Sequence, residues 1–307
     1  MKRLVQGTVA VAALIAAGAA DAADMVVKAP PPPPIATDCF ANDIVKANNQ
    51  LSVDFVETSV KYGPEIITPN SAGIGPVGVP LDGLKGWVPG MRGIASVMTT
   101  IGPLCNIYLS GSFTHVNGHT DYWSNSGFLP TNVNGARIDD WDFRVGKGFN
   151  VGQNAMITPY FGAGTRWWDN LLNGQFGYNE VYKHAYTGGG LLLQYSPVPG
   201  WVLSANGLIG RTFDASQTSS LSPGGTTAIC VCVFPLGTST TYEIGGSVDY
   251  AITEHVHASA GVDYTYFKYG QSPVITHVLL PFGTVDSIEP NSKTSDTTVS
   301  VGVGYHW

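Results

Sequence analysis

The strongest constraint on the fold of this 307-residue chain is a two-residue alternation of side chains. At the C-terminal end, apolar or aromatic residues occupy every second position, namely Val299, Val301, Val303, Tyr305 and Trp307. Successive side chains of a strand point to opposite faces of a sheet, so this period predicts strands with one apolar and one polar face. The same pattern runs through residues 242–252 and 256–266, which indicates an all-β fold.

Turn signals divide the chain into ten such segments, joined by short and long connections in alternation. The expected strands are 50–62, 86–100, 105–119, 138–149, 155–169, 184–196, 201–213, 240–252, 255–269 and 295–307. The alternation in 50–62 shifts phase near Phe55, which a β-bulge would explain. If the first two segments are loop instead, eight strands remain, so eight is the alternative count.

Composition favours a membrane barrel. Charged residues are 12% of the chain, about half the share in a typical soluble domain. After residue 22 the sequence has no continuous apolar run suited to a transmembrane helix. A closed antiparallel barrel crosses a bilayer without such a run, because its backbone groups pair between strands. We therefore expect a transmembrane, antiparallel, up-and-down β-barrel over residues 50–307. The net charge of −7 argues against a nucleic-acid partner.

The N-terminal region predicts export. Residues 1–22 combine a basic start, an uncharged apolar run and small residues at the end, as a cleaved signal peptide does. A membrane anchor is the alternative, although the apolar run is shorter than the roughly 20 residues that a helix needs to span a bilayer. Residues 23–49 contain five consecutive prolines and predict a stiff periplasmic tether. One helical turn is expected in residues 38–49.

These features together resemble the outer-membrane β-barrel proteins of Gram-negative bacteria, the superfamily of opacity-protein-like and porin-like surface barrels. The resemblance rests on the export signal, the Lys-Ala-Pro-rich tether and the ending Val-Gly-Val-Gly-Tyr-His-Trp, and it covers about residues 50–307. It implies a location in the outer membrane, contact with its lipid, and insertion by the barrel assembly machinery. Val303, Tyr305 and Trp307 resemble the family's C-terminal assembly signal. The superfamily contains pores, adhesins, structural proteins and a few enzymes, so the resemblance does not determine the activity.

The polar faces of the expected strands would place a charge network in the lumen. Its predicted members are Asp54, Arg92, Asp140, Asp142, Arg144, Arg166, Glu243, Asp249 and Asp263, together with His255 and His257. Buried charges must be paired, so ion pairs that plug a narrow barrel are expected. Ten strands enclose an interior little wider than that of eight strands, which side chains fill. A narrow channel for ions or small solutes is the alternative.

Enzymatic chemistry, cofactors and metals are not expected. Omptin proteases are ten-stranded barrels with acidic residues and a histidine at the outer rim, where a histidine oriented by a carboxylate can activate water. The candidates at that rim are His119 with Asp121, Asp139 with Asp140, and Asp169. The family's Asp-x-His pair does not occur in the sequence. His255 and His257 would share a strand face and could ligate a metal, but the sequence fixes no third ligand.

Export makes disulfide bonds accessible to the four cysteines. Cys39 precedes the first strand and Cys105 follows the first short turn, so the topology places both on the periplasmic side. A Cys39–Cys105 disulfide is predicted, with free thiols as the alternative.

The long connections face outward and could bind an extracellular ligand; they are residues 63–85, 120–137, 170–183, 214–239 and 270–294. The expected function is that of a non-enzymatic envelope-structural or surface-exposed protein. A narrow channel is the second reading, and an omptin-like surface protease is the third.

Overall fold

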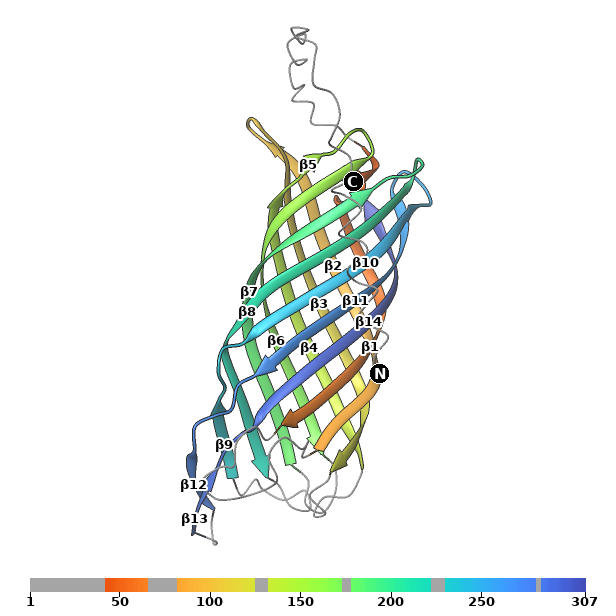
Figure 1. The fold of residues 1–307 in the computed structure, drawn as a ribbon. Helices are drawn as coiled ribbons and strands as arrows, with labels where there is room; N and C mark the ends of the chain where they lie inside the picture. Colours follow the sequence, from red (N-terminus) through yellow and green to blue (C-terminus); the bar gives the residue numbers. More distant parts are fainter. Residues whose placement is uncertain (1–41, 66–81, 125–131, 173–177, 222–229, 280–282) are drawn as a thin grey trace, which may run out of the picture. The chain divides into compact units, whose positions relative to one another are not determined.

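The structure, a computed structural model, describes residues 42–65, 82–124, 132–172, 178–221, 230–279 and 283–307. Ten long strands form a closed antiparallel barrel (Figure 1). They are β1 (Gln50–Glu65), β2 (Asp82–Ile101), β3 (Leu104–Ser124), β4 (Asn132–Lys147), β6 (Ala155–Leu172), β7 (Tyr178–Tyr195), β8 (Trp201–Leu221), β10 (Thr240–Ala251), β11 (Val256–Tyr269) and β14 (Asn291–His306). Each pairs with its neighbour in the chain, and β14 pairs with β1 to close the barrel. The predicted all-β barrel and its ten strands are confirmed.

Four short strands and one helix complete the described part. β5 (Phe149–Asn150) pairs with β6, and β9 (Cys230–Pro235) pairs with the outer end of β8. β12 (Ile275–Leu279) and β13 (Gly283–Ser287) form a separate hairpin. The helix is α1 (Asp43–Ala47), within the segment where one helical turn was expected. No helix among the described residues is long and apolar enough to cross a bilayer.

The predicted bulge near Phe55 is wrong. β1 pairs without interruption with β14 on one side and β2 on the other. Leu51, Val53 and Phe55 are exposed on the outer face, whereas Asp54 and Val56 are buried. The apparent phase shift arises because an apolar residue, Val56, faces the lumen.

The outer wall of the barrel has two zones. The strand segments nearest the short turns carry exposed apolar residues, such as Phe55, Phe143, Leu193 and the alternating valines of β14. The segments nearest the long connections carry exposed polar residues, including Lys61, Asp121, Arg137, Lys268 and Lys293. The apolar zone is a belt suited to lipid, and the strands extend beyond this belt on the side of the long connections.

Candidate functional site

At the end of the short turns, α1 packs into the lumen. Asn42 caps this helix by accepting a hydrogen bond from the Val45 amide (2.9 Å). Ile44 is fully buried, and it lies in an apolar cluster that includes Met98, Tyr108, Met156 and Leu192. Residues 42–49 of the predicted tether therefore pack into the mouth of the barrel.

Hydrogen bonds fix the helix to the wall at three points. The Asn48 side chain donates to Gln194 Oε1 (2.7 Å), and the Ser96 hydroxyl donates to the Asn48 carbonyl (2.8 Å). The amide of Gly200, in the turn between β7 and β8, donates to the Asp43 carboxylate (2.9 Å). These contacts join α1 to β7, β2 and the turn between β7 and β8, so the helix is held in place inside the barrel mouth.

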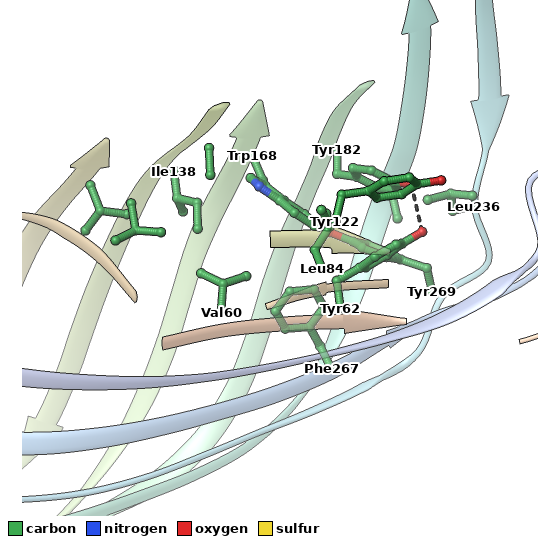
Figure 2. Packing of buried hydrophobic residues seen from close by; sticks show 14 of the residues in the cluster. Val60, Tyr62, Leu84, Tyr122, Ile138, Trp168, Tyr182, Leu236, Phe267 and Tyr269 are labelled. Carbon is green, nitrogen blue, oxygen red and sulfur yellow. Dashed lines mark hydrogen bonds between the residues drawn. The ribbon is translucent and has the colours of Figure 1, made fainter. Parts of the chain in front are cut away.

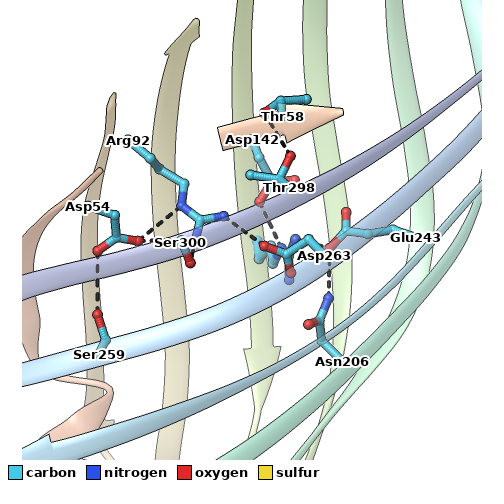
Figure 3. A network of polar contacts seen from close by, with 11 residues as sticks. Asp54, Thr58, Arg92, Asp142, Asn206, Glu243, Ser259, Asp263, Thr298 and Ser300 are labelled. Carbon is cyan, nitrogen blue, oxygen red and sulfur yellow. Dashed lines mark hydrogen bonds and ion pairs between the residues drawn. The ribbon is translucent and has the colours of Figure 1, made fainter. Parts of the chain in front are cut away.

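The middle of the lumen holds a charge layer in which each arginine bridges two carboxylates from different strands. Arg92 donates to Asp54 (3.1 Å) and Asp263 (2.9 Å), and also to the Ser300 hydroxyl (2.9 Å) (Figure 3). These partners lie on β1, β11 and β14, so one guanidinium ties together strands on both sides of the barrel closure.

Two further arginines repeat this arrangement. Arg144 donates to Asp142 (2.7 Å) and Glu243 (2.6 Å), and Arg166 donates to Asp140 (2.9 Å) and Asp296 (2.5 Å). The layer therefore contains three guanidinium groups and six carboxylates. Eight of the nine predicted lumen residues belong to it; the ninth, Asp249, lies nearer the short turns. Asp296 was missed, although it shares its strand face with Thr298 and Ser300.

The end of the lumen nearest the long connections is apolar and aromatic, contrary to the expected polar interior. Trp168 is fully buried, and its ring centroid lies 5.2 Å from those of Tyr62 and Tyr182 (Figure 2). The hydroxyls of Tyr62 and Tyr182 are 2.8 Å apart, and Tyr182 also donates to Glu289 (2.9 Å). Glu289 lies in the connection between β13 and β14, where burial raises the pKa of its carboxyl group to about 7.

Two cavities bordered by described residues lie inside the barrel. One of about 150 Å³ borders Ile138 and Phe267, and one of about 190 Å³ borders Gln50 and Gln194. Side chains of the charge layer, among them Arg92 and Arg144, line both cavities. The charge layer thus lies between them, and each cavity has room for several water molecules.

Comparison with protein-family models and with curated protein sequences gives no match. The solved structure of the outer membrane protease OmpT from Escherichia coli is similar, with a TM-score of 0.57 at 10% identity over 85% of this chain and 97% of OmpT. The translocator domain of the autotransporter NalP from Neisseria meningitidis has a TM-score of 0.32 at 13% identity, over 84% of this chain and 89% of that one. Neisserial surface protein A has a TM-score of 0.28 at 12% identity, over 84% and 97%.

The likeness to OmpT shows a shared fold. The chain has the outer-membrane β-barrel fold. Its apolar belt is suited to lipid, and the polar outer zone of the strands lies beyond that belt. At 10% identity the likeness to OmpT carries no information about activity.

All but one of the omptin-like candidates of this outer-membrane barrel lie on its outer wall. His119 and Asp121 are both exposed on the outer face of β3. Asp139 also faces outward, where it pairs with His115 at 2.6 Å, whereas Asp140 faces the lumen. Asp169 is within 4.0 Å of Arg137, outside the lumen as well. The structure therefore does not gather the candidate histidine and acids inside the barrel mouth.

His255 and His257 of the outer-membrane barrel lie in different environments. β11 begins at Val256, so His255 lies in the turn, is exposed, and stacks on Tyr305 with ring centroids 5.3 Å apart. His257 is fully buried in the lumen. The expectation that both share one face is wrong. His257 instead lies close to Asp249 and His306. The alternation within a single strand does not reveal this group, because its members come from three strands.

The predicted disulfide is tested only at one of its two cysteines. Cys105, at the start of β3, and Cys232, on β9, are both disulfide-bonded. Cys39 lies outside the described residues, so its pairing with Cys105 stays a prediction. Val303, Tyr305 and Trp307 of the predicted assembly signal are exposed on the outer wall, within reach of lipid.

Proposed function

We propose that this outer-membrane barrel is a non-enzymatic envelope protein with a closed lumen, which presents its long connections at the cell surface. The observation that carries the proposal is the filling of the lumen at three successive levels. α1 closes the mouth near the short turns, the three arginine bridges cross the middle, and the aromatic cluster around Trp168 closes the outer end.

The charge layer resists opening of the lumen. We infer that a continuous water path past it requires at least one guanidinium to leave its carboxylates. Breaking a buried charge pair costs about 3–5 kcal/mol when one partner stays buried without its counter-charge. A path through this layer alone would therefore be open for less than about 1% of the time, because each 1.4 kcal/mol is about a tenfold change in population.

The outer end of the barrel supports presentation of the connections. β8 continues beyond the apolar belt and pairs with β9, and the β12–β13 hairpin extends from the same end (Figure 1). The aromatic cluster gives this outer zone an interior of its own, with Tyr269, Phe267 and Leu236 among its members. A rigid outer scaffold of this kind suits loops that meet an extracellular ligand.

Conductance across a planar bilayer tests the closed lumen. The refolded chain of residues 23–307 should give no current steps once insertion is confirmed by protease protection, and a general porin added afterwards should conduct in the same bilayer. Stable steps whose ion selectivity changes in Arg92→Gln or Arg144→Gln would replace the proposal with the narrow channel.

Peptide cleavage tests the non-enzymatic part of the proposal. Purified barrel and intact cells that carry it should leave a peptide library uncleaved. Cleavage that disappears in His119→Ala but persists in His255→Ala, an exposed histidine at the opposite end, would establish the protease reading instead.

A further inference from the structure

Three residues near the short turns bring metal-ligating side chains together inside the lumen. Asp249 lies on β10, His257 on β11 and His306 on β14, and these three strands are adjacent in the sheet. The carboxylate of Asp249 accepts a hydrogen bond from Nδ1 of His257 and lies 3.8 Å from Nε2 of His306. One ligand atom from each residue falls within 4.8 Å of the other two.

Both imidazoles carry a nitrogen that nothing in the described protein satisfies. His257 is fully buried and His306 is 3% exposed. Within the described residues, Nε2 of each has no hydrogen-bond partner. A buried polar atom left unpaired costs about 1–3 kcal/mol, so two of them side by side indicate a ligand between them.

The donor atoms of the cluster suit a metal ion. The two rings face each other with centroids 3.8 Å apart, and one carboxylate lies beside them. Imidazole nitrogens and carboxylate oxygens are ligands that divalent transition metals accept.

The strand opposite His257 is shaped for its ring. Gly304 pairs with His257 across β11 and β14, and any side chain at that position would collide with Nε2 of His257. Because Gly304 has no side chain, the edge of the His257 ring stays uncovered. The ring of His306, two residues further along β14, lies next to it.

We propose that Asp249, His257 and His306 form a binding site for a divalent transition-metal ion, with Zn²⁺ as the preferred occupant. Two imidazoles and one carboxylate are a common donor set for zinc, and a water molecule supplies the fourth ligand in such sites. The cavity of about 190 Å³ reaches Asp249 and can supply that water. A tetrahedral ion with bonds of about 2.1 Å spaces its ligands by roughly 3.4 Å, so the stacked rings must rotate to bring both Nε2 lone pairs onto one ion.

The bound ion would clamp the C-terminal strand to its neighbours. His306 is the last residue of β14, whose pairing with β1 and β11 closes the barrel. An ion held by β10, β11 and β14 therefore stabilises the closed barrel over forms in which the final strand has detached. Binding to the folded form alone raises the resistance to unfolding as the ion concentration exceeds the dissociation constant.

Metal titration of the refolded chain, produced without a histidine tag and treated with chelator, tests the site. Calorimetry with Zn²⁺ should show one saturable site per chain, and Co²⁺ should give the visible spectrum of a tetrahedral complex. Binding should fall at least about tenfold, the usual loss on removing a supporting or direct ligand, in His306→Gln and in Asp249→Asn. His255→Gln is the matched control, because His255 is exposed and close by, and it should bind as the unsubstituted chain does.

Unfolding in urea gives a second readout. Zn²⁺ should raise the unfolding midpoint of the unsubstituted chain and of His255→Gln, and leave that of His306→Gln unchanged. The absence of saturable Zn²⁺ binding to the unsubstituted, correctly folded barrel overturns the proposal even if the variants fail to fold. Binding that survives in both His306→Gln and Asp249→Asn also overturns it, since the ion must then lie elsewhere.

Discussion

Replacing Arg166 by methionine should destabilise the barrel more than any other single removal of a lumen cation. Arg166 bridges Asp140 of β4 and Asp296 of β14, and only 7% of its side chain and 5% of that of Asp296 is exposed. Methionine keeps the length of the side chain and its contact with Phe267, but it leaves two carboxylates without a counter-charge. Breaking a buried pair in this way costs about 3–5 kcal/mol.

The intact network itself should contribute far less than this loss. Nε of Arg166 and one oxygen of each carboxylate lack a hydrogen-bond partner among the described residues. The free energy lost by removing the three charged groups from water is thus only partly offset by their mutual contacts. Neutral side chains of similar shape are often as stable as a buried ion pair. The triple variant Arg166→Met, Asp140→Asn, Asp296→Asn should therefore recover at least half of the stability that Arg166→Met loses.

Equilibrium unfolding in urea, followed by tryptophan fluorescence in lipid vesicles, measures both effects. Lys183→Met is the matched control, because its ammonium lies 3.6 Å from the Trp167 ring on the outer wall rather than in the lumen. An exposed cation–π pair is worth about 0.5–1 kcal/mol, so that variant should lose no more. If Arg166→Met loses as little as the control, or the triple variant loses as much as Arg166→Met, the uncompensated carboxylates are not the cause.

Four further outcomes follow from the structure. Burial raises the pKa of Glu289 from 4.5 to about 7, so the folded barrel favours the protonated carboxyl group. The stability that this proton contributes is complete below pH 4.5 and is lost as the pH rises through about 7. The urea midpoint should therefore decrease as the pH is raised from about 5 to about 8, and it should decrease less in Glu289→Gln. Tyr62→Phe removes the hydroxyl that meets Tyr182 and should cost about 1 kcal/mol in the same assay. Peptide mapping without reduction should recover Cys39 joined to Cys105, a linkage that Cys39→Ser abolishes. Trp307→Ala with Tyr305→Ala should lower the amount of heat-modifiable barrel in cell envelopes, whereas Val198→Ala, an exposed apolar residue of a turn, should not.

The strand positions could be predicted because alternation and turn residues are local signals. All ten expected segments overlap an observed strand, and the short turns fall between the same pairs. The lumen-facing charges could be predicted for the same reason, since parity along one strand fixes the face. Their partners could not: Arg92 and Asp263 are 171 residues apart, and only the stagger of a closed barrel brings them within 2.9 Å.

The missed features share a different cause. The predictions from the sequence placed apolar side chains outside the barrel and polar side chains inside it along the whole length of each strand. That rule holds within the lipid belt, where Phe55 faces outward and Asp54 inward. Beyond the belt the rule reverses on β1, because Lys61 is exposed to water while Val60 and Tyr62 are buried. In the sequence, a reversal within one strand resembles a slip in phase, which is why the pattern predicts a bulge.

This reversal also bears on where function resides. A strand segment with a polar outside and an apolar inside is stable in water, as in a soluble barrel, and needs no lipid. The outer zone therefore has its own source of stability in the cluster of Tyr62, Trp168 and Tyr182, in addition to the charge layer beneath it. Substitutions that weaken the charge layer should leave the outer zone folded, and a ligand of the connections should bind such variants as well as the original barrel. Loss of ligand binding in Arg166→Met, with the outer zone still protected from hydrogen exchange, would instead tie recognition to the lumen.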